Sequence, residues 1–294
     1  MAETPPILTG LSGTADRYDG FILDLWGVLH DGVRAYPGAA DALARLKAGA
    51  KRIVLLSNSP GRRRLVADKM AGMGIGPDLY DHLVTSGEVT FEALRDRDDP
   101  FHAALGRRCF LIGTRHDRHL LEGLDGVDPV DEPAGADFVL VTGAHRHDSR
   151  VEDYEDCLAA CAARGLPMVC ANPDLIVMVG SRDMAICAGA LARRYEEMGG
   201  RVAYHGKPHP PVYRRCLDLM GNPDARRVLA VGDSLRTDVQ GAARAGLDAA
   251  FTACGIHREE LGTLGGGAPE PARVAALLAD APYRPTWILP DFRW

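Results

Sequence analysis

The sequence predicts an α/β protein built on a mostly parallel sheet, and two patterns lead to this prediction. Short apolar runs of the length of buried strands alternate with longer amphipathic stretches along the 294 residues. Several of these runs end on polar residues, as parallel strands do at the sheet edge where ligands bind. Hydrophobic residues make up 46% of the chain and charged residues 25%, which is ordinary for a globular protein with a sizeable core.

Each predicted element follows from its local pattern. Buried strands are expected at the apolar runs 21–23, 53–56, 109–112, 138–141, 168–171, 228–231 and 249–251. Helices are expected at 37–48, 62–71, 151–164 and 183–198, and between the last two strands up to about residue 245. Pro37 at its start and Gly49 just past its end are typical of the first helix. The C-terminal residues from 282 onward are rich in proline and aromatic residues, so we expect them to lie against the body of the protein or a partner subunit.

Composition argues against several classes of protein. The net charge of −6 argues against a general nucleic-acid binder, which would carry a basic face. The seven cysteines are odd in number and form no Cys-x-x-Cys pair, which favours a reducing, cytoplasmic location. The N-terminus lacks the pattern of a signal peptide, and no apolar run is long enough to span a membrane. No nucleic-acid or membrane partner is therefore expected.

Polar residues follow three of the predicted strands. Asp24 and the pair Ser57 and Asn58 come directly after apolar runs, Asp233 follows such a run after Gly232, and Lys207 lies in a turn-like segment. Each alone is a common turn or cap residue. Together they match the needs of phosphoryl transfer, which uses a carboxylate nucleophile, a second carboxylate for a hard cation, and donors for the phosphate oxygens. The chain therefore predicts a phosphoryl-transfer site with Mg²⁺ at this edge of the sheet.

Four segments resemble, in order, the four motifs of the haloacid dehalogenase superfamily. They are Asp24-Leu25-Trp26-Gly27-Val28-Leu29, Ser57-Asn58, Lys207 and Gly232-Asp233-Ser234-Leu235-Arg236-Thr237-Asp238. The long insertion between the second and third motifs is similar to class IIA of that superfamily, which carries a type 2 α/β cap. The resemblance implies a Rossmann-like, doubly wound core formed by 1–87 and 203–294, with the cap inserted at 88–202. Residues 36–39 and 171–174 also resemble that class.

The resemblance implies a Mg²⁺-dependent phosphatase. It would hydrolyse a small phosphorylated metabolite, such as a sugar phosphate or a nucleotide, through an aspartyl-phosphate. It implies that Asp24 is the nucleophile and that Lys207 and Asp233 complete the catalytic set. Mg²⁺ would be held by Asp24, the Trp26 backbone carbonyl and Asp233, and Asp238 would orient the metal's water or reach its shell. The phosphoryl group would be bound by Ser57, the Asn58 amide and Lys207. Asp174 and Arg182 in the cap would contribute to substrate binding, and a homodimer through the cap or the C-terminus is a further expectation.

Trp26 departs from the family pattern. The family usually has an aspartate there that protonates the leaving group and then activates water. Indole has no such proton chemistry, and the loss of a general acid or base costs about 10²–10⁴-fold in rate. His30 or Asp31 is a candidate substitute in the same loop, or the substrate has a leaving group that needs no acid, such as an acyl phosphate. A non-catalytic phosphometabolite binder and a phosphotransferase stay open, and Trp26 is also a candidate aromatic lid.

Overall fold

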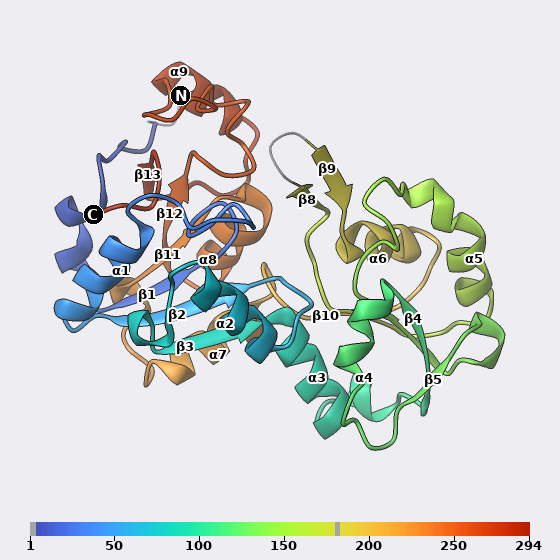
Figure 1. Cartoon of the computed structure of the whole chain (residues 1–294). Coiled ribbons are helices and arrows are strands. Elements are labelled where there is room, and N and C mark those ends of the chain that lie inside the picture. The colour runs from blue at the N-terminus through green and yellow to red at the C-terminus, as the bar shows by residue number, and fades with distance from the viewer. Residues whose placement is uncertain (1–3, 180–182) are drawn as a thin grey trace. The chain divides into compact units, whose positions relative to one another are not determined.

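The computed structural model describes residues 4–179 and 183–294. The chain divides into two compact units. Unit 1 comprises Met1–Ser57, Ala67–Val84 and Lys207–Trp294, and unit 2 comprises Asn58–Val66 and Thr85–Gly206. Each unit is built around its own parallel sheet with helices, so the predicted α/β class is confirmed (Figure 1).

The sheet of unit 1 has the order β13-β12-β11-β1-β2-β3. Its strands are β1 (Gly20–Leu23), β2 (Arg52–Ser57), β3 (His82–Thr85), β11 (Val228–Gly232), β12 (Asp248–Thr252) and β13 (Trp287–Leu289). The pairings from β13 to β2 are all parallel. The chain moves outward to one side of β1 through β2 and β3, and to the other side through β11 to β13. The strand order therefore reverses between β1 and β11, which is where open α/β sheets bind ligands.

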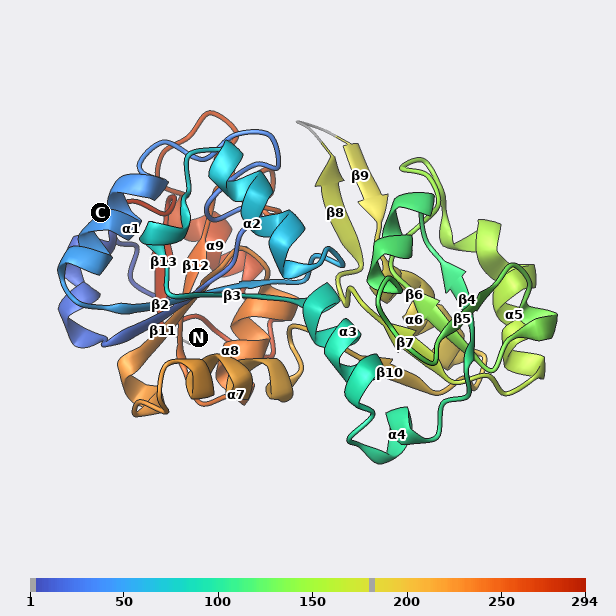
Figure 2. The same ribbon diagram turned by 60° about the horizontal axis from the view of Figure 1, so that its bottom comes forward.

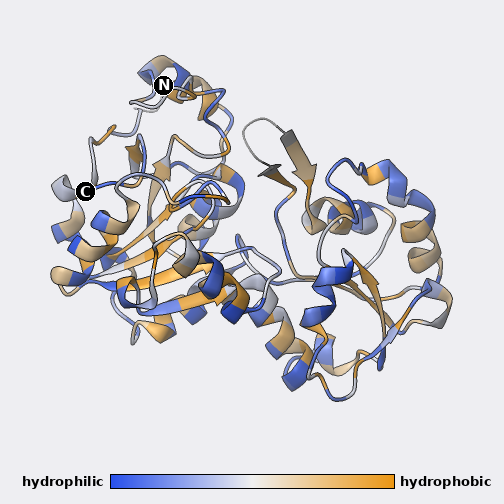
Figure 3. Cartoon of the chain, in the orientation of Figure 1, coloured by the Kyte–Doolittle hydropathy of each residue, from blue (hydrophilic) through white to orange (hydrophobic). Residues whose placement is uncertain are grey.

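Helices cover both faces of this sheet, as in a doubly wound fold. They are α1 (Ala39–Ala48), α2 (Arg63–Gly72), α7 (Pro210–Leu219), α8 (Gln240–Arg244) and α9 (Pro271–Leu277). Figure 2 shows α1 on one face and α7 and α8 on the other. The strands between them are apolar: every residue of β1 and β11 is buried, and Figure 3 shows hydrophobic colouring along this sheet. Short 3₁₀ turns occupy Leu11–Gly13, Ala15–Arg17, Pro77–Leu79 and Ala225–Arg227.

The aromatic C-terminus is part of unit 1. β13 pairs in parallel with β12, and the N-terminal Ile7 forms a bridge with Ile288 on its far side. Phe292 is completely buried, and the Leu11 N–H donates to the Arg293 carbonyl. The prediction that this segment lies against the body of the protein is confirmed. Its role as an edge strand was not predicted, because prolines around a three-residue strand hide the apolar pattern.

Unit 2 contains a second parallel sheet of order β10-β7-β6-β4-β5. Its strands are β4 (Arg108–Ile112), β5 (Asp128–Val130), β6 (Phe138–Val141), β7 (Met168–Cys170) and β10 (Val202–Tyr204), and its helices are α3 (Ser86–Asp96), α4 (Pro100–Ala103), α5 (Glu155–Ala163) and α6 (Ala188–Glu197). Alternate residues of β6 face two different clusters of the core: Val139 packs with residues of α5 and α6, and Leu140 with residues of α3. This sheet is therefore buried on both faces, as parallel sheets usually are.

One predicted helix is partly wrong. The helix expected at 183–198 begins at Ala188, because residues Asp183–Ile186 form strand β9. β9 pairs antiparallel with β8 (Ile176–Val179). Cross-strand pairing within this hairpin is a tertiary effect, so it outweighs the helical tendency of a four-residue segment. The helix predicted at 151–164 likewise starts with a 3₁₀ turn, Val151–Tyr154, before α5.

Two general features of the chain bear on its class. No helix among the residues that the structure describes has both the length and the apolar character needed to cross a membrane. None of the seven cysteines, which all lie within the described ranges, forms a disulfide.

Candidate active site

The reversal point of the larger sheet carries two carboxylates. Asp24 follows β1 directly, and its backbone N–H donates to the Val231 carbonyl over 2.9 Å. Asp233 follows β11, the strand beside β1. The register places Leu23 opposite Val231, so both side chains leave the sheet at the same edge. Each is only 8% exposed, which is uncommon for a carboxylate and usually requires a charged partner.

A third carboxylate reaches the same place from the turn after β11. Asp238 lies in η8 (Leu235–Val239), a π-helical turn, and its Oδ2 accepts a hydrogen bond from the Ser234 N–H at 3.1 Å. Gly232 permits this fold-back, because a Cβ atom at that position would collide with the Asp238 carboxyl group. The turn therefore directs Asp238 back over the end of its own strand.

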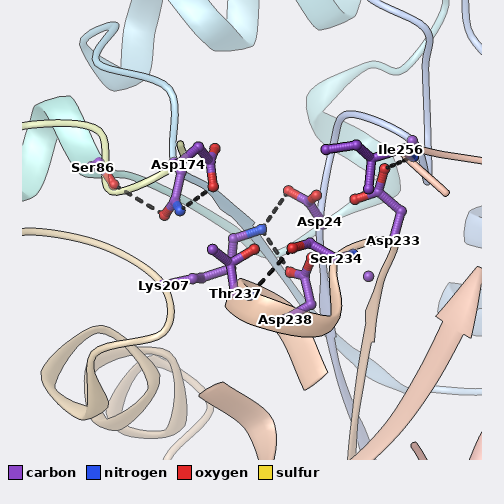
Figure 4. Close-up of polar contacts among 12 residues, drawn as sticks. Asp24, Ser86, Asp174, Lys207, Asp233, Ser234, Thr237, Asp238 and Ile256 are labelled. Carbon is purple, nitrogen blue, oxygen red and sulfur yellow. Dashed lines mark hydrogen bonds and ion pairs between the residues drawn. The ribbon is translucent and has the colours of Figure 1, made fainter. Parts of the chain in front are cut away.

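Lys207 links these carboxylates. Its Nζ lies 2.7 Å from Asp24 Oδ1 and 2.7 Å from Asp238 Oδ1, and its side chain is 3% exposed. Figure 4 shows the ammonium group between the two carboxylates, with Asp233 held separately by the Ile256 N–H. Two buried carboxyl groups thus pair with one ammonium group and a third lies beside them, so the cluster holds more acidic groups than cations.

The three carboxylates fit a divalent hard cation. One oxygen from each of Asp24, Asp233 and Asp238 lies within 4.8 Å of the others. Magnesium prefers oxygen ligands and usually takes only one or two carboxylates from the protein, with water or phosphate filling its shell. The donor chemistry and the excess of acidic groups over cations therefore both match the predicted Mg²⁺ site.

Burial shapes the protonation of this cluster. It raises the pKa of Asp24 to about 7, against the lowering effect of Lys207 and with a further increase from Asp238. Burial also raises the pKa of Asp233 well above its ordinary value, and the nearby Asp24 raises it further. In the metal-free protein the cluster therefore retains protons near neutral pH, and a cation that binds there has to displace them.

The other predicted site residues lie in both units. Ser57 is the last residue of β2 and is buried next to the β1 edge in unit 1. The Asn58 side chain belongs to unit 2, where its Nδ2 donates to Asp174 Oδ1 at 2.9 Å and its Oδ1 accepts from Ser86 Oγ at 3.3 Å. The structure therefore joins Asn58 to Asp174, a pairing that the sequence did not predict. Arg182 lies outside the described residues.

Comparison with known proteins is consistent with this geometry. A family model described as haloacid dehalogenase-like hydrolase matches residues 21–126, and a HAD-hydrolase-like model matches residues 204–293. The crystal structure of a hydrolase of the haloacid dehalogenase-like family from Brucella suis 1330 is 35% identical, with a TM-score of 0.80, and the match covers 97% of this chain and 100% of that one. The chain belongs to the haloacid dehalogenase-like hydrolase family.

Two further relatives are less identical to this chain. Ribonucleotide monophosphatase NagD of Escherichia coli K12 is 27% identical over 275 residues, which cover 92% of this chain and 95% of that protein. The structure of a 4-nitrophenylphosphatase from Thermotoga maritima is 25% identical with a TM-score of 0.69, covering 93% of this chain and 94% of that one. The predicted assignment to the family, and to its hydrolases, is confirmed.

In this haloacid dehalogenase-like hydrolase, the loop after β1 holds Trp26 firmly. Its ring lies edge-to-face against His30 with 5.7 Å between ring centroids, and Lys69 Nζ lies 5.9 Å from the indole centroid. Gly32 adopts φ +92, and a Cβ atom there would collide with the indole. The indole therefore packs within its own loop and against α2.

Neither candidate substitute for the missing acid is well suited to the task. His30 is buried, its Nδ1 accepts a hydrogen bond from the Gly32 N–H at 2.9 Å, and burial and the nearby Lys69 lower its pKa to about 4. Asp31 accepts hydrogen bonds from the N–H groups of Val33 and Arg34. Although partial burial raises the pKa of Asp31, these N–H groups bring it below its ordinary value. At neutral pH neither side chain has a proton it can readily donate.

Sequence reasoning missed several supporting residues. Tyr213 on α7 donates to the Thr237 and Asp238 carbonyls over 3.2 and 3.3 Å, which anchors η8. Thr252, the last residue of β12, donates to the Gly27 carbonyl at 3.1 Å. Ile256 in the following loop supplies the N–H for Asp233. The rule that found Asp24 and Asp233, polar groups beyond strand ends, would also have pointed to Thr252.

The raised pKa values predict an unusual dependence of stability on pH. A group whose pKa is higher in the folded than in the unfolded protein stabilises the fold below its unfolded pKa, and this stability is lost as pH rises through the folded pKa. For Asp24 the loss extends from about pH 4, its ordinary pKa, to about pH 7, its pKa in the folded protein. His30 acts in the opposite sense, but only below about pH 6.5, where its unfolded form gains a proton.

We therefore expect the metal-free protein to lose stability between about pH 5 and 7.5, with His30 offsetting part of the loss below about pH 6.5, by up to about 1.4 kcal/mol per pH unit for each proton released. Each kcal/mol lowers the melting temperature by about 2–4 °C. Thermal unfolding in EDTA across this range measures the effect. Mg²⁺ should stabilise the protein most at the high end of the range. A melting temperature that rises with pH in EDTA would show that the cluster is fully ionised.

Gly27 is expected to be essential to the site. It adopts φ +74, and a Cβ atom there would collide with Asp233 Oδ2. Gly27→Ala should cost about 1–2 kcal/mol for the backbone conformation and about 1–3 kcal/mol more for the collision. Gly74→Ala is the matched control, because Gly74 adopts φ +87 with open space around it. Denaturant unfolding and the Mg²⁺ concentration for half-maximal activity measure both variants, and equal effects would refute the collision.

Proposed function

We propose that this chain is a Mg²⁺-dependent phosphatase that cleaves a small phosphorylated metabolite through an aspartyl-phosphate on Asp24. The observation that carries the proposal is the pairing of Lys207 with Asp24 and Asp238 at the reversal point of the sheet, beside Asp233. Family relatives named as a ribonucleotide monophosphatase and a 4-nitrophenylphosphatase support a phosphate ester as the substrate.

In the proposed reaction, a carboxylate oxygen of Asp24 attacks phosphorus, and the bond to the leaving oxygen breaks. Lys207 holds Asp24 in one orientation through its ion pair and offers positive charge next to the attacked group. Ser57 and the backbone N–H of Asn58 bind the oxygens of the transferred group. Water then attacks phosphorus, phosphate leaves, and the Asp24 carboxylate is restored.

The metal site of this proposal consists of Asp24, Asp233, Asp238 and the backbone carbonyl of Trp26. When bound, Mg²⁺ would neutralise the negative charge of the carboxylates and of the phosphate oxygens. The Ile256 N–H keeps Asp233 oriented, and the Ser234 N–H does the same for Asp238. Unit 2 serves in this proposal as the cap that selects the substrate, with Asp174 held in place by Asn58.

A phosphate-release assay tests the proposal. The purified protein is incubated with sugar phosphates, nucleotides, aryl phosphates and acyl phosphates, in Mg²⁺ and in EDTA. We expect release from at least one class in Mg²⁺ and none in EDTA. Borohydride reduction of acid-quenched protein should convert phosphorylated Asp24 to homoserine, which peptide mass spectrometry detects. Absence of both phosphate release and Asp24 labelling across the panel would favour a non-catalytic binder instead.

Trp26 favours a second candidate, a phosphotransferase. Without a side chain that activates water, an aspartyl-phosphate would last long enough for another nucleophile to compete. Adding alcohols or amines at high concentration tests this candidate. A phosphorylated acceptor formed at the expense of phosphate would support transfer, and phosphate release that acceptors leave unchanged would support simple hydrolysis.

A further inference from the structure

The loop that carries the nucleophile bears on the chemical class of the substrate. In the loop of residues 24–34, all of which the structure describes, the ionisable side chains are Asp24, His30, Asp31 and Arg34. Asp24 is the proposed nucleophile, and an arginine keeps its proton under all ordinary conditions. The choice of a proton donor within the loop therefore lies between His30 and Asp31.

Both of these side chains are already engaged in hydrogen bonds within the loop. His30 accepts a hydrogen bond at Nδ1 from the Gly32 N–H and packs against the Trp26 ring, so it is a neutral imidazole buried in the loop. Asp31 Oδ1 accepts from two backbone N–H groups of the turn that follows it, at 2.9 and 2.8 Å. Trp26, two residues after Asp24, presents an indole that does not ionise. The loop therefore has no group that can hand a proton to a departing oxygen.

The second carboxylate of the site is also enclosed. Asp233 Oδ2 accepts from the Ile256 N–H at 2.8 Å, and Cβ atoms at either Gly27 or Gly255 would collide with it. The backbone at Gly27 and at Gly255 therefore packs closely against this carboxyl group on the side of Oδ2. Asp238 is held by Lys207 and the Ser234 N–H. These carboxylates are positioned for a cation, and their contacts leave them poorly placed to protonate a leaving group.

An alkyl phosphate depends on such a proton. Without it the leaving group is an alkoxide, which is about as basic as hydroxide, from water of pKa about 15.7. A carboxylate, with a pKa of about 4, or a phenolate, with a pKa of about 10, departs far more readily as the anion. General acid catalysis contributes about 10²–10⁴-fold, and its absence penalises alkyl phosphates selectively.

We propose that this enzyme acts on phosphates whose leaving group departs as a stable anion, namely acyl phosphates and the phosphates of acidic hydroxyl groups such as phenols and enols. This inference rests on the proposed phosphatase function. In the first step an Asp24 oxygen bonds to phosphorus, and the electron pair of the broken phosphorus–oxygen bond leaves with the carboxylate or aryloxide. In the second step water attacks phosphorus, the electron pair returns to Asp24, and the water proton passes to solvent.

The second step has a kinetic consequence. The aspartyl-phosphate is itself an acyl phosphate, so Asp24 leaves without an acid, but no described side chain of the loop activates the water. Hydrolysis of the intermediate is therefore the slow step for a substrate with a good leaving group. A rapid burst of leaving-group release should precede steady turnover, with an amplitude near one equivalent per enzyme.

A leaving-group series tests the proposal. We would measure kcat/KM of the full chain with Mg²⁺ for acetyl phosphate, substituted phenyl phosphates and glycerol 3-phosphate. The wild type should prefer the acyl and aryl substrates over the alkyl substrate by at least about 10²-fold. Trp26→Asp should raise alkyl cleavage relative to aryl cleavage by a similar factor. Trp26→Asn, which matches Asp in size but has no acidic proton, should keep the wild-type preference at whatever absolute rate it shows.

The outcomes separate the inference from the function on which it rests. Wild-type cleavage of the alkyl phosphate within about tenfold of the aryl phosphates would overturn the inference and leave the phosphatase function intact, because a proton donor would then come from elsewhere. No turnover and no burst with any substrate would overturn both. If the Trp26 variants fail to fold, the wild-type series and the burst amplitude still decide the question.

Discussion

Replacing Asp24 with asparagine is expected to abolish phosphate release, by roughly 10⁴-fold or more, as the removal of catalytic nucleophiles does in other hydrolases. The amide oxygen is a poor nucleophile, and the change also removes one of the two carboxylates paired with Lys207. The fold should survive, because asparagine has nearly the same shape and the Asp24 backbone N–H keeps its bond to Val231. Phosphate release and cooperative thermal unfolding measure the two effects separately.

Asp41→Asn is the control for this change. Asp41 lies on α1 in the same unit, and its exposed side chain pairs with Arg45 one turn away. Removing such a surface charge typically alters stability by less than about 1 kcal/mol, and activity should stay at the wild-type level. Intact-mass measurement has to exclude deamidation of the introduced asparagine back to aspartate. Phosphate release by a verified Asp24→Asn protein at more than about a tenth of the wild-type rate would refute the nucleophile assignment.

Replacing Lys207 with methionine is expected to have the largest effect on stability. Lys207 supplies the cation that faces Asp24 and Asp238 in a region with little solvent. Removing one partner of a buried ion pair costs about 3–5 kcal/mol, because the remaining charges stay buried without compensation. Protonation of the carboxylates relieves part of this cost, so the loss should grow as pH rises above about 7. Activity should also fall by about 10²–10³-fold, as expected for loss of one electrostatic contact to the phosphoryl group.

Lys47→Met provides the comparison. Lys47 pairs with Asp81, and each side chain is about a third exposed. A surface pair of this kind contributes about 0–1 kcal/mol. Denaturant unfolding in EDTA at pH 6 and pH 8 should show a large, pH-dependent loss for Lys207→Met and a small loss for Lys47→Met. Mg²⁺ should restore part of the stability of Lys207→Met without restoring its activity. Equal losses for the two variants would show that Lys207 is not the counter-ion of the cluster.

The strands of the larger sheet were largely predictable from the sequence. Runs such as 21–23 and 228–231 are wholly apolar and lead into a carboxylate. A short run of this kind is typical of a parallel strand that is buried on both faces. The hairpin of β8 and β9 was missed, because its pairing depends on residues outside the local window. β13 was missed for the same reason, since only contact with β12 makes three residues a strand.

The sequence by itself determined the order of the site residues and the departure at Trp26. Local spacing is sufficient to place Asp24 and Asp233 at strand ends, because a short apolar run followed by a polar residue indicates the end of a buried strand without any knowledge of distant contacts. It also identified Lys207 as a candidate without showing what it contacts.

Only the tertiary structure decided the partners and the protonation of these groups. Asn58 and Asp174 lie 116 residues apart in the chain and are hydrogen-bonded in the fold. Burial raises the pKa of Asp24 and lowers that of His30, and burial is a property of the packed chain that no local pattern contains. For the same reason, His30 could be put forward as a substitute acid from its place in the sequence, while its bond to the Gly32 N–H and its burial against Trp26 argue against that role.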